Sequence, residues 1–197
     1  MNLALFDFDG TITVNDTFSA FLPHAVSPRR LLLGRIVLAP VVLGYKLGLV
    51  SAPMIRTLAS AFAFRGKDEA ALRAAGERYA RERLPGFVRP QALERIRWHQ
   101  SRGDRVVVVS ASLDVYLGTW CAAHGVELIC NELEVREGRM TGRMREGDRG
   151  AFKSQLIMDR YRLGEYSDVY AYGDTHEDEA MLDLANRRFY RWQELPA

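Results

Sequence analysis

The chain has 197 residues, of which 48% are hydrophobic and 26% charged, proportions close to those of soluble globular proteins. These values exclude a disordered chain, a collagen-like repeat and a protein with several membrane spans. The formal net charge of +2 gives no indication of nucleic-acid binding. The two cysteines, Cys121 and Cys130, form no CxxC pair, so buried thiols in a reducing compartment are expected.

The first predicted elements are one buried strand and a long helical block. The apolar run from Asn2 to Phe8 is too short for a helix and is interrupted by acid near its end, which is typical of a buried strand. From Asp16 to about Arg83 the pattern is helical, with prolines and glycines as breaks. The apolar stretch Leu31–Val50 is long enough to span a bilayer, but its two basic residues, proline and three glycines argue against insertion.

Beyond this block, strands and helices alternate. Arg105–Val109 is a β-branched run typical of a central parallel strand, and Glu132–Met144 is typical of a hairpin with its turn at Glu137-Gly138. Further strands are expected at Val126–Cys130, Val169–Tyr172 and Arg188–Arg191, and helices at Val88–Arg102, Leu113–His124, Ala151–Leu163 and Glu177–Ala185. The alternation predicts an α/β fold with a doubly wound, Rossmann-like parallel sheet and an inserted all-helical cap after the first strand. The expected division is a core of residues 1–15 and 86–197 and a cap of residues 16–85.

Polar side chains follow the predicted strands at the edge where such sheets carry their chemistry. The first strand leads into Asp7–Thr11 (DFDGT), and the second ends in Ser110–Ser112 (SAS). Lys153 lies near the start of a later helix, and Asp174 and Asp178 follow another strand. Clustered carboxylates repel one another unless a hard cation such as Mg²⁺ lies among them. A cation, a nucleophilic carboxylate and an anion-binding helix start are the groups that phosphoryl transfer needs.

These motifs, in this order, resemble those of the haloacid dehalogenase superfamily of phosphotransferases. The resemblance rests on DFDGT, VVVVSAS, the helical Lys153 and YGDTHEDEAML, and it covers the whole chain. The insert after the first motif, together with DTFSAFL, GDRVVVVSASLDVYL and LEVREGRMTGR, resembles the phosphoserine-phosphatase-like branch, subfamily IB. The resemblance implies a Mg²⁺-dependent phosphatase.

The resemblance also implies catalytic roles. Asp7 would be the nucleophile that becomes an aspartyl-phosphate. Asp9 would be the general acid for the leaving oxygen and then the base that activates water. Ser110, Ala111 and Lys153 would bind the phosphate group.

A metal site is implied in the same way. Mg²⁺ would be held by Asp7, by Asp9 through its backbone carbonyl and by Asp174, with Asp178 as a further or water-mediated ligand. Glu177 stands where phosphoserine phosphatases usually carry Asn, so additional negative charge is expected beside the metal.

The composition of the helical block bears on the substrate. Thr17–Lys67 holds seven basic and no acidic residues, so it carries +7 and the rest of the chain −5 (2 minus 7). A basic, apolar cap indicates an anionic, partly apolar partner: a lipid phosphate head group, with peripheral association at an anionic membrane. In length and cap layout the chain resembles the phosphatidylglycerophosphate phosphatases of this branch, which makes phosphatidylglycerophosphate one candidate substrate.

An ordinary cap over a small soluble phosphomonoester, such as phosphoserine or histidinol phosphate, stays open as an alternative. Asp16, nine residues after Asp7, aligns with a substrate-binding acid of phosphoserine phosphatases. Asp16 and Arg56 are the candidate substrate contacts.

Two other classes of function stay open: a phospho-accepting switch and a non-catalytic membrane-binding module. The acid at Asp9 argues for ester hydrolysis, because the resemblance implies that dehalogenases lack it and that P-type ATPases carry Thr there. The chain is expected to be cytoplasmic, with peripheral association at the inner membrane surface as an alternative.

Overall fold

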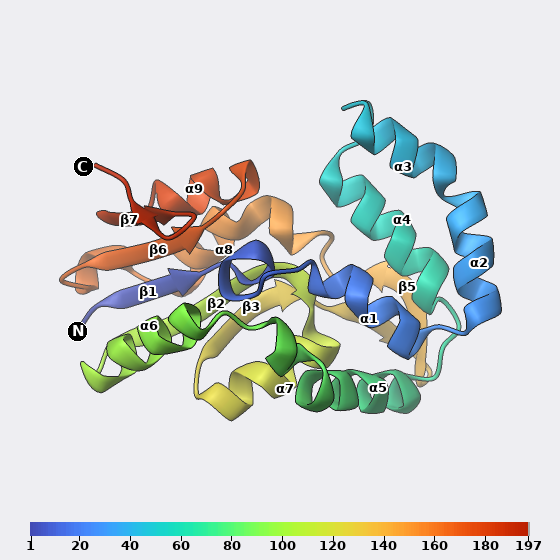
Figure 1. Cartoon of the computed structure of the whole chain (residues 1–197), viewed down its shortest axis with the longest axis horizontal. Helices are drawn as coiled ribbons and strands as arrows, with labels where there is room; N and C mark the ends of the chain where they lie inside the picture. The colour runs from blue at the N-terminus through green and yellow to red at the C-terminus, as the bar shows by residue number, and fades with distance from the viewer. Residues whose placement is uncertain (197) are drawn as a thin grey trace.

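The computed structural model describes residues 1–196 and is built around a six-stranded sheet (Figure 1). Its strands are β1 (Leu3–Phe6), β2 (Arg105–Leu113), β3 (Glu127–Asn131), β6 (Val169–Gly173), β7 (Arg187–Tyr190) and β8 (Gln193–Glu194). The order is β3–β2–β1–β6–β7–β8, and every neighbouring pair is parallel except β7 with β8. The carboxyl end of β1 therefore lies between those of β2 and β6. The predicted doubly wound α/β fold is confirmed.

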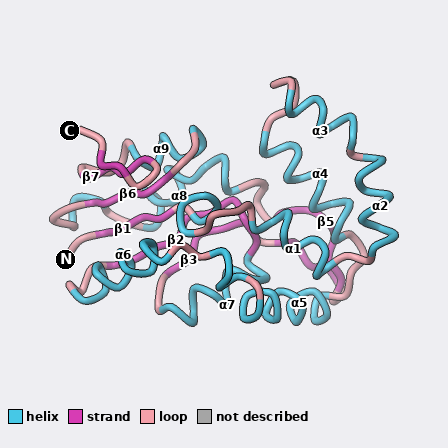
Figure 2. Tube along the Cα trace, in the orientation of Figure 1, coloured by secondary structure: helices cyan, strands magenta, loops and turns pink. Residues whose placement is uncertain are grey.

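Helices cover both faces of this sheet (Figure 2). On β1, Phe6 packs into a cluster with residues of α6 and α7, whereas Leu5 packs into a second cluster with residues of α8 and α9. Because both faces are buried, the strand is apolar without alternation. The four helices are α6 (Pro90–Ser101), α7 (Asp114–His124), α8 (Lys153–Arg160) and α9 (Glu179–Leu182).

The segment inserted between β1 and β2 is helical, as predicted. Its helices are α1 (Thr17–Ala25), α2 (Pro28–Val37), α3 (Ala39–Lys46), α4 (Ala52–Phe64) and α5 (Glu69–Glu82). Helices α2, α3 and α4 project away from the sheet, whereas α5 lies beside α7 (Figures 1 and 2). Among residues 1–196, no helix is long and apolar enough to cross a membrane.

Helix α5 packs closely on α7 because of a glycine. A Cβ atom at Gly76 would lie 2.0 Å from the carbonyl oxygen of Val115, so only glycine permits this separation of the two helices. Part of the inserted segment is therefore fixed to the helical layer of the sheet.

The predicted hairpin consists of β4 (Leu133–Arg136) and β5 (Arg139–Met144), with its turn at Glu137-Gly138. It contacts the chain that joins α4 to α5: the N–H of Gly66 donates to the carbonyl of Met140, and the N–H of Met140 donates to the carbonyl of Lys67, each at 2.8 Å. The division into residues 1–15 with 86–197 and residues 16–85 stays a prediction, because α5 and the hairpin both connect these two parts.

Some element bounds differ from the predicted ones. Strand β2 continues through Ser110 to Leu113, with a register irregularity against β3 after Val109. The helix predicted from Ala151 begins at Lys153, because Asp148 accepts a hydrogen bond from the N–H of Gly150 and caps a short 3₁₀ turn first.

Candidate active site

The site begins where β1 ends in a tight turn over Phe8–Ile12. Gly10 adopts a φ of 88° in this turn, a conformation that side chains disfavour. A Cβ atom at Gly10 would also lie 2.3 Å from Oδ2 of Asp174. The glycine therefore allows the turn after β1 to approach the acid that follows β6.

Three carboxylates meet at this edge. Asp7, Asp174 and Asp178 each place an oxygen within 4.8 Å of the other two. The hydroxyl of Thr11 donates to Asp174 at 3.0 Å, and Asp178 accepts from the N–H groups of Asp174 and Thr175 at 3.1 Å each. Carboxylate oxygens are the donors that Mg²⁺ prefers, so this group of residues fits the implied metal.

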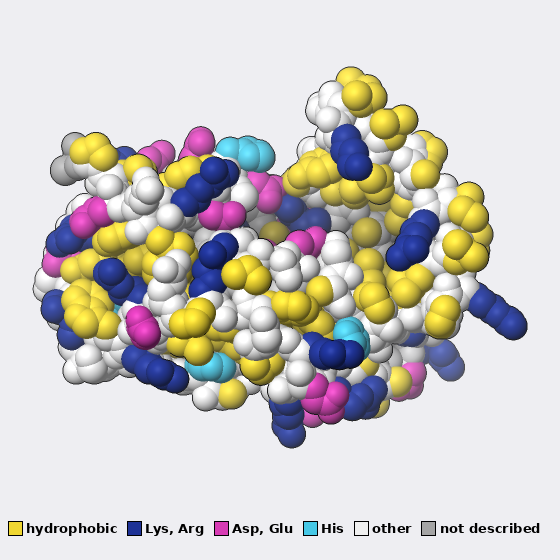
Figure 3. All heavy atoms as spheres, viewed as in Figure 1, with side chains coloured by type: hydrophobic (Ala, Val, Ile, Leu, Met, Phe, Trp, Pro, Cys, Tyr) yellow, Lys and Arg dark blue, Asp and Glu magenta, His cyan; other side chains and the backbone are white. Residues whose placement is uncertain are grey.

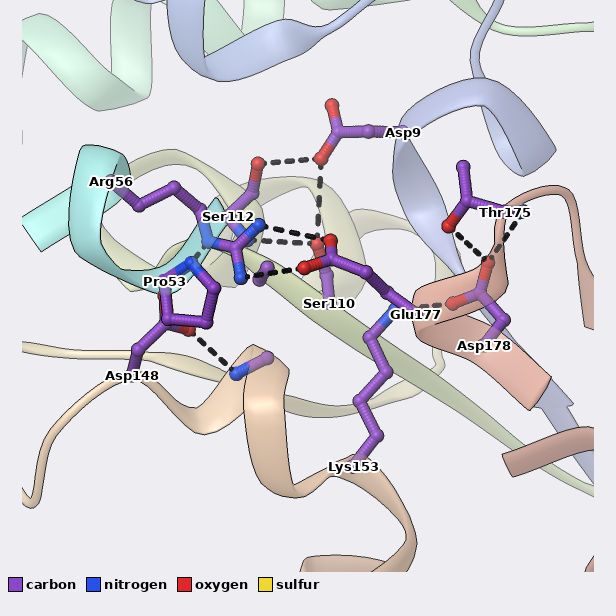
Figure 4. A network of polar contacts seen from close by, with 12 residues as sticks. Asp9, Pro53, Arg56, Ser110, Ser112, Asp148, Lys153, Thr175, Glu177 and Asp178 are labelled. Carbon is purple, nitrogen blue, oxygen red and sulfur yellow. Dashed lines mark hydrogen bonds and ion pairs between the residues drawn. The ribbon is translucent and has the colours of Figure 1, made fainter. Parts of the chain in front are cut away.

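Lys153, the first residue of α8, lies between Asp7 and Asp178, and Figure 4 shows its contact with Asp178. Its Nζ is 2.5 Å from Oδ1 of Asp7 and 2.6 Å from Oδ1 of Asp178. Burial raises the pKa of Asp7 to about 8, although the charge of Lys153 opposes that shift. Positive charge in addition to that of Lys153 is therefore needed to keep the Asp7 carboxylate ionised at neutral pH.

Asp9 belongs to a separate hydrogen-bond network. Its Oδ1 accepts from the N–H of Thr17 at 2.7 Å and from the Thr17 hydroxyl at 2.5 Å, and its Oδ2 accepts from the Ser112 hydroxyl at 2.6 Å. Burial raises the pKa of Asp9, and the bonds from Ser112 and Thr17 oppose the shift. A buried carboxyl with a raised pKa is suited to holding a proton that it later donates.

The predicted phosphate-binding residues of β2 lie beside Asp9. The hydroxyl of Ser110 accepts from the N–H of Ser112 at 3.0 Å and is 3.5 Å from Oδ2 of Asp9. Ala111 lines the cavity at this edge, and its carbonyl accepts from the side-chain amide of Asn131 at 2.6 Å. The end of β2 is thus held in place by β3.

Arg56 of α4 reaches across to the sheet edge. Its Nε donates to Asp148 at 2.8 Å, and its two terminal nitrogens donate to Glu177 at 2.9 and 3.1 Å (Figure 4). The charge of Glu177, expected to add to that of the metal site, is therefore compensated by Arg56. Arg56 itself is engaged by two carboxylates.

Asp16 is an N-cap residue. It precedes α1 and accepts from the N–H groups of Phe18 and Ser19 at 3.0 and 3.3 Å and from the Ser19 hydroxyl at 2.5 Å. It also lines the cavity, close to the start of the helical segment. Its carboxylate therefore contributes to the start of α1 as well as to the cavity wall.

A cavity of about 710 Å³ connects the acids to the projecting helices. Its inner end is lined by Asp7, Asp9, Ala111, Ser112 and Lys153. Farther out, most of the lining is apolar and comes from α1 to α4, including Leu22, Leu31, Leu38, Val42, Ile55 and Phe62. The space-filling view shows the molecule hollowed between the projecting helices and the sheet edge (Figure 3).

Some functional side chains were not identified from the sequence. Thr17 and Ser112 fix the carboxyl of Asp9, and Asp148 holds Arg56 together with Glu177, which was expected beside the metal and not as a partner of Arg56. For Ser112 a signal existed, because it is two residues from Ser110 and a strand places such residues on one face. The partners of Arg56 come from separate elements, and no local pattern indicates them.

Comparison with known proteins identifies relatives of the whole chain. Residues 4–183 match the family model of haloacid dehalogenase-like hydrolases. Protein CicA of Caulobacter vibrioides is 30% identical over 200 residues, which cover 96% of this chain and 85% of the relative. A solved protein of unknown function from Bordetella pertussis Tohama I is 25% identical, with a TM-score of 0.79 over 96% of this chain and 89% of that one. A substrate-bound phosphoserine phosphatase is 20% identical, with a TM-score of 0.70 over 95% and 84% of the two chains, and shares the fold.

Proposed function

The chain belongs to the haloacid dehalogenase-like hydrolase family, and on that premise we propose that it is a Mg²⁺-dependent phosphomonoesterase. The observation that carries this proposal is the pair of acids after β1: Asp7 beside Lys153 and two further carboxylates, and Asp9 in a network of hydroxyl donors. In this proposal Asp7 attacks phosphorus and Asp9 exchanges a proton.

In the first half of the reaction, an oxygen of the Asp7 carboxylate forms a bond to phosphorus while the bond between phosphorus and the ester oxygen breaks. Asp9 gives its proton to that oxygen, and the alcohol leaves. The raised pKa of Asp9 favours the protonated form that this step requires. The product is an aspartyl-phosphate at Asp7.

In the second half, Asp9 takes a proton from water as the water oxygen attacks phosphorus. The bond between phosphorus and the Asp7 oxygen breaks, phosphate leaves, and the carboxylate is restored. Thr17 and Ser112 hold the carboxyl of Asp9 throughout, so that the same group serves both steps.

The remaining groups bind the phosphate and the metal. Ser110, Ala111 and Lys153 would bind the phosphate oxygens; of these, Ala111 and Lys153 line the cavity. Asp7, Asp174, Asp178 and the backbone carbonyl of Asp9 would hold Mg²⁺. When bound, the ion supplies positive charge that keeps a neighbouring carboxylate ionised and offsets charge on the transferred group.

For the substrate, the cavity supports a phosphomonoester with an apolar part, such as phosphatidylglycerophosphate. Beyond the acids most of the lining is apolar, with Arg30, Arg35 and Lys46 among it, and apolar lining binds alkyl chains through burial of their surface. A small amino-acid phosphate would need polar contacts in the same region. The two candidates for such contacts, Asp16 and Arg56, are engaged by the start of α1 and by Asp148 with Glu177.

The substrate class can be tested with matched compounds. Turnover of phosphatidylglycerophosphate in detergent micelles would be compared with that of glycerol 3-phosphate, phosphoserine and histidinol phosphate, each with and without Mg²⁺. We expect kcat/KM to be at least about tenfold higher for the lipid, since burying even a few methylene groups is worth more than that. Faster turnover of phosphoserine or histidinol phosphate would overturn the lipid proposal and leave the phosphatase proposal standing.

The same assay separates an enzyme from a phospho-accepting switch or a non-catalytic module. A switch would accept one phosphoryl group per chain and then stop, and a non-catalytic module would release none. We expect many turnovers of an aryl phosphate per chain, because Asp9 is placed to activate water. A single stoichiometric burst without steady-state release would contradict the proposal.

A further inference from the structure

The side of α2 and α3 that faces away from the cavity is apolar and exposed. We call it the outer face and define it by Leu32, Leu33, Ile36, Val37, Leu43 and Leu47, each of which is more than half exposed. Hydrophobic side chains lie over these helices in Figure 3, with basic side chains among them. Soluble monomers rarely expose a contiguous apolar patch of this kind, and such patches usually mark an interaction site.

The opposite side of the same helices is largely apolar too. Leu31, Gly34, Leu38 and Val42 line the cavity, together with Arg30, Arg35 and Lys46. An exposed helix of a soluble protein usually has one apolar and one polar side, and a helix that is apolar all round is normally covered on both. The cavity accounts for one side of α2 and α3, so the outer face requires a partner of its own.

The positive charge of the inserted segment indicates which partner fits the outer face. The segment Thr17–Lys67 holds seven basic residues and no acidic one; Arg56 is paired with Asp148 and Glu177, and the other six leave the segment positively charged. A symmetric pairing of two copies through the outer face would bring the same basic segments together, which is unfavourable. An anionic lipid surface attracts each basic residue and also accepts apolar side chains at its interface.

The length of the helices sets the mode of contact. Helices α2 and α3 have 10 and 8 residues, which is far short of the thickness of a bilayer. Such helices lie in the plane of the interface with their apolar side chains among the head groups. Arg29 of α2 is exposed and is not part of the cavity lining, so its charge can remain in the head-group layer.

We propose that the outer face of α2 and α3 docks this protein on an anionic lipid surface. This docking adds a partner to the proposed function and does not depend on turnover. Because the inner side of the same two helices lines the cavity, docking would place the apolar part of the cavity beside the bilayer. A lipid phosphate substrate would then move from the bilayer past α2 and α3 to reach the cavity.

The experiment is co-sedimentation of the full chain with vesicles of phosphatidylglycerol and phosphatidylcholine, compared with vesicles of phosphatidylcholine alone, at low and high salt. The test variant carries Leu33→Gln and Ile36→Gln, two exposed changes outside the cavity lining. The control carries Met158→Gln and Leu195→Gln, which remove exposed apolar side chains elsewhere. Turnover of a soluble aryl phosphate is measured for each protein.

We expect binding that needs the anionic lipid, weakens with salt, and falls about tenfold or more in the Leu33→Gln, Ile36→Gln variant but not in the control. Aryl phosphate turnover should be the same in all three proteins, so a failure of docking is distinguishable from a failure of catalysis. Equal binding to neutral and anionic vesicles, or no binding, would overturn the proposal. A dimer in solution that the same two substitutions dissociate would overturn it as well, because the outer face would then join two copies.

Discussion

The inner and outer ends of the cavity hold their side chains in different ways. At the inner end, Asp7, Asp9 and Lys153 are each bonded at 2.5 to 2.7 Å by groups from other elements. At the outer end, apolar side chains such as Leu38 and Phe62 form the wall and fix no atom of a ligand. The inner end is built for one chemical group in one position, and the outer end for a range of shapes. Changes at the inner end should therefore affect every substrate equally, and changes at the outer end should affect substrates according to what is attached to the phosphate.

The largest effect is expected from Asp7→Asn. Turnover of every phosphomonoester should fall to background, by at least about 10⁴-fold, because an amide is a very poor nucleophile toward phosphorus. Steady-state release of phosphate from an aryl phosphate and from a lipid phosphate measures this. Circular dichroism should show that the variant is folded. Substantial activity on either substrate would mean that another group attacks phosphorus.

Asp9→Asn should be next in size, with a loss of about 10²- to 10⁴-fold, the usual contribution of a general acid or base. Both halves of the reaction should slow, because one group serves both. Rapid-quench measurements of aspartyl-phosphate formation and decay distinguish the two rates. A variant that forms the intermediate at the normal rate and fails only in its breakdown would show that another group protonates the leaving oxygen.

The metal site can be examined through Asp174→Asn. Removing one of three anionic ligands should raise the Mg²⁺ concentration for half-maximal activity by about 10- to 100-fold. The loss should be recovered at high Mg²⁺, unlike the loss in Asp7→Asn. Full activity of the unmodified chain after chelation of divalent metal would show that these acids serve another purpose.

The outer end is tested by Leu38→Asn, which places an amide in the apolar wall. We expect kcat/KM for a short-chain lipid phosphate, monomeric in solution, to fall about tenfold more than kcat/KM for an aryl phosphate. Leu32→Asn makes the same change on the exposed side of α2. It should not change the ratio of kcat/KM for the lipid phosphate to kcat/KM for the aryl phosphate. An equal loss for both substrates would mean that the two ends of the cavity do not act separately.

The smallest effect is expected at Arg56, which links the two ends. Arg56→Gln and Glu177→Gln should each lower stability by about 1 to 3 kcal/mol, the usual value of hydrogen bonds between charged groups. The double variant should lose less than the sum, with a coupling of about 1 kcal/mol in thermal or denaturant unfolding. If Arg56 instead contacts a substrate carboxylate, Arg56→Gln would raise KM for phosphoserine far more than for an aryl phosphate.

The sequence predicted the sheet and its acidic edge because those signals are local. Asp7 and Asp9 lie in one five-residue motif at the end of an apolar run, and the parallel topology brings Asp174 to the same edge. The network around Asp9 and the pairing of Arg56 with Glu177 were not predictable in that way. Arg56 and Glu177 are 121 positions apart, and their contact depends on how α4 stands over the sheet. The end of β2 was placed too early, because the β-branched run stops at Val109 while backbone pairing continues to Leu113.

Helices α2, α3 and α4 form an arm that is anchored at both ends of the inserted segment and is also held to the sheet edge through Arg56, near the start of α4. At one end the chain enters from α1, and at the other it joins the hairpin through Gly66, just before α5 is locked to α7 at Gly76. The exposed tip of this arm is the turn between α3 and α4, at the top of Figure 1, where Leu49 is 80% exposed. A given force displaces such an arm most when it acts at the tip. A surface that binds Leu49 would therefore change the width of the cavity more than one that binds the start of α2, while the acids at the sheet edge keep their positions.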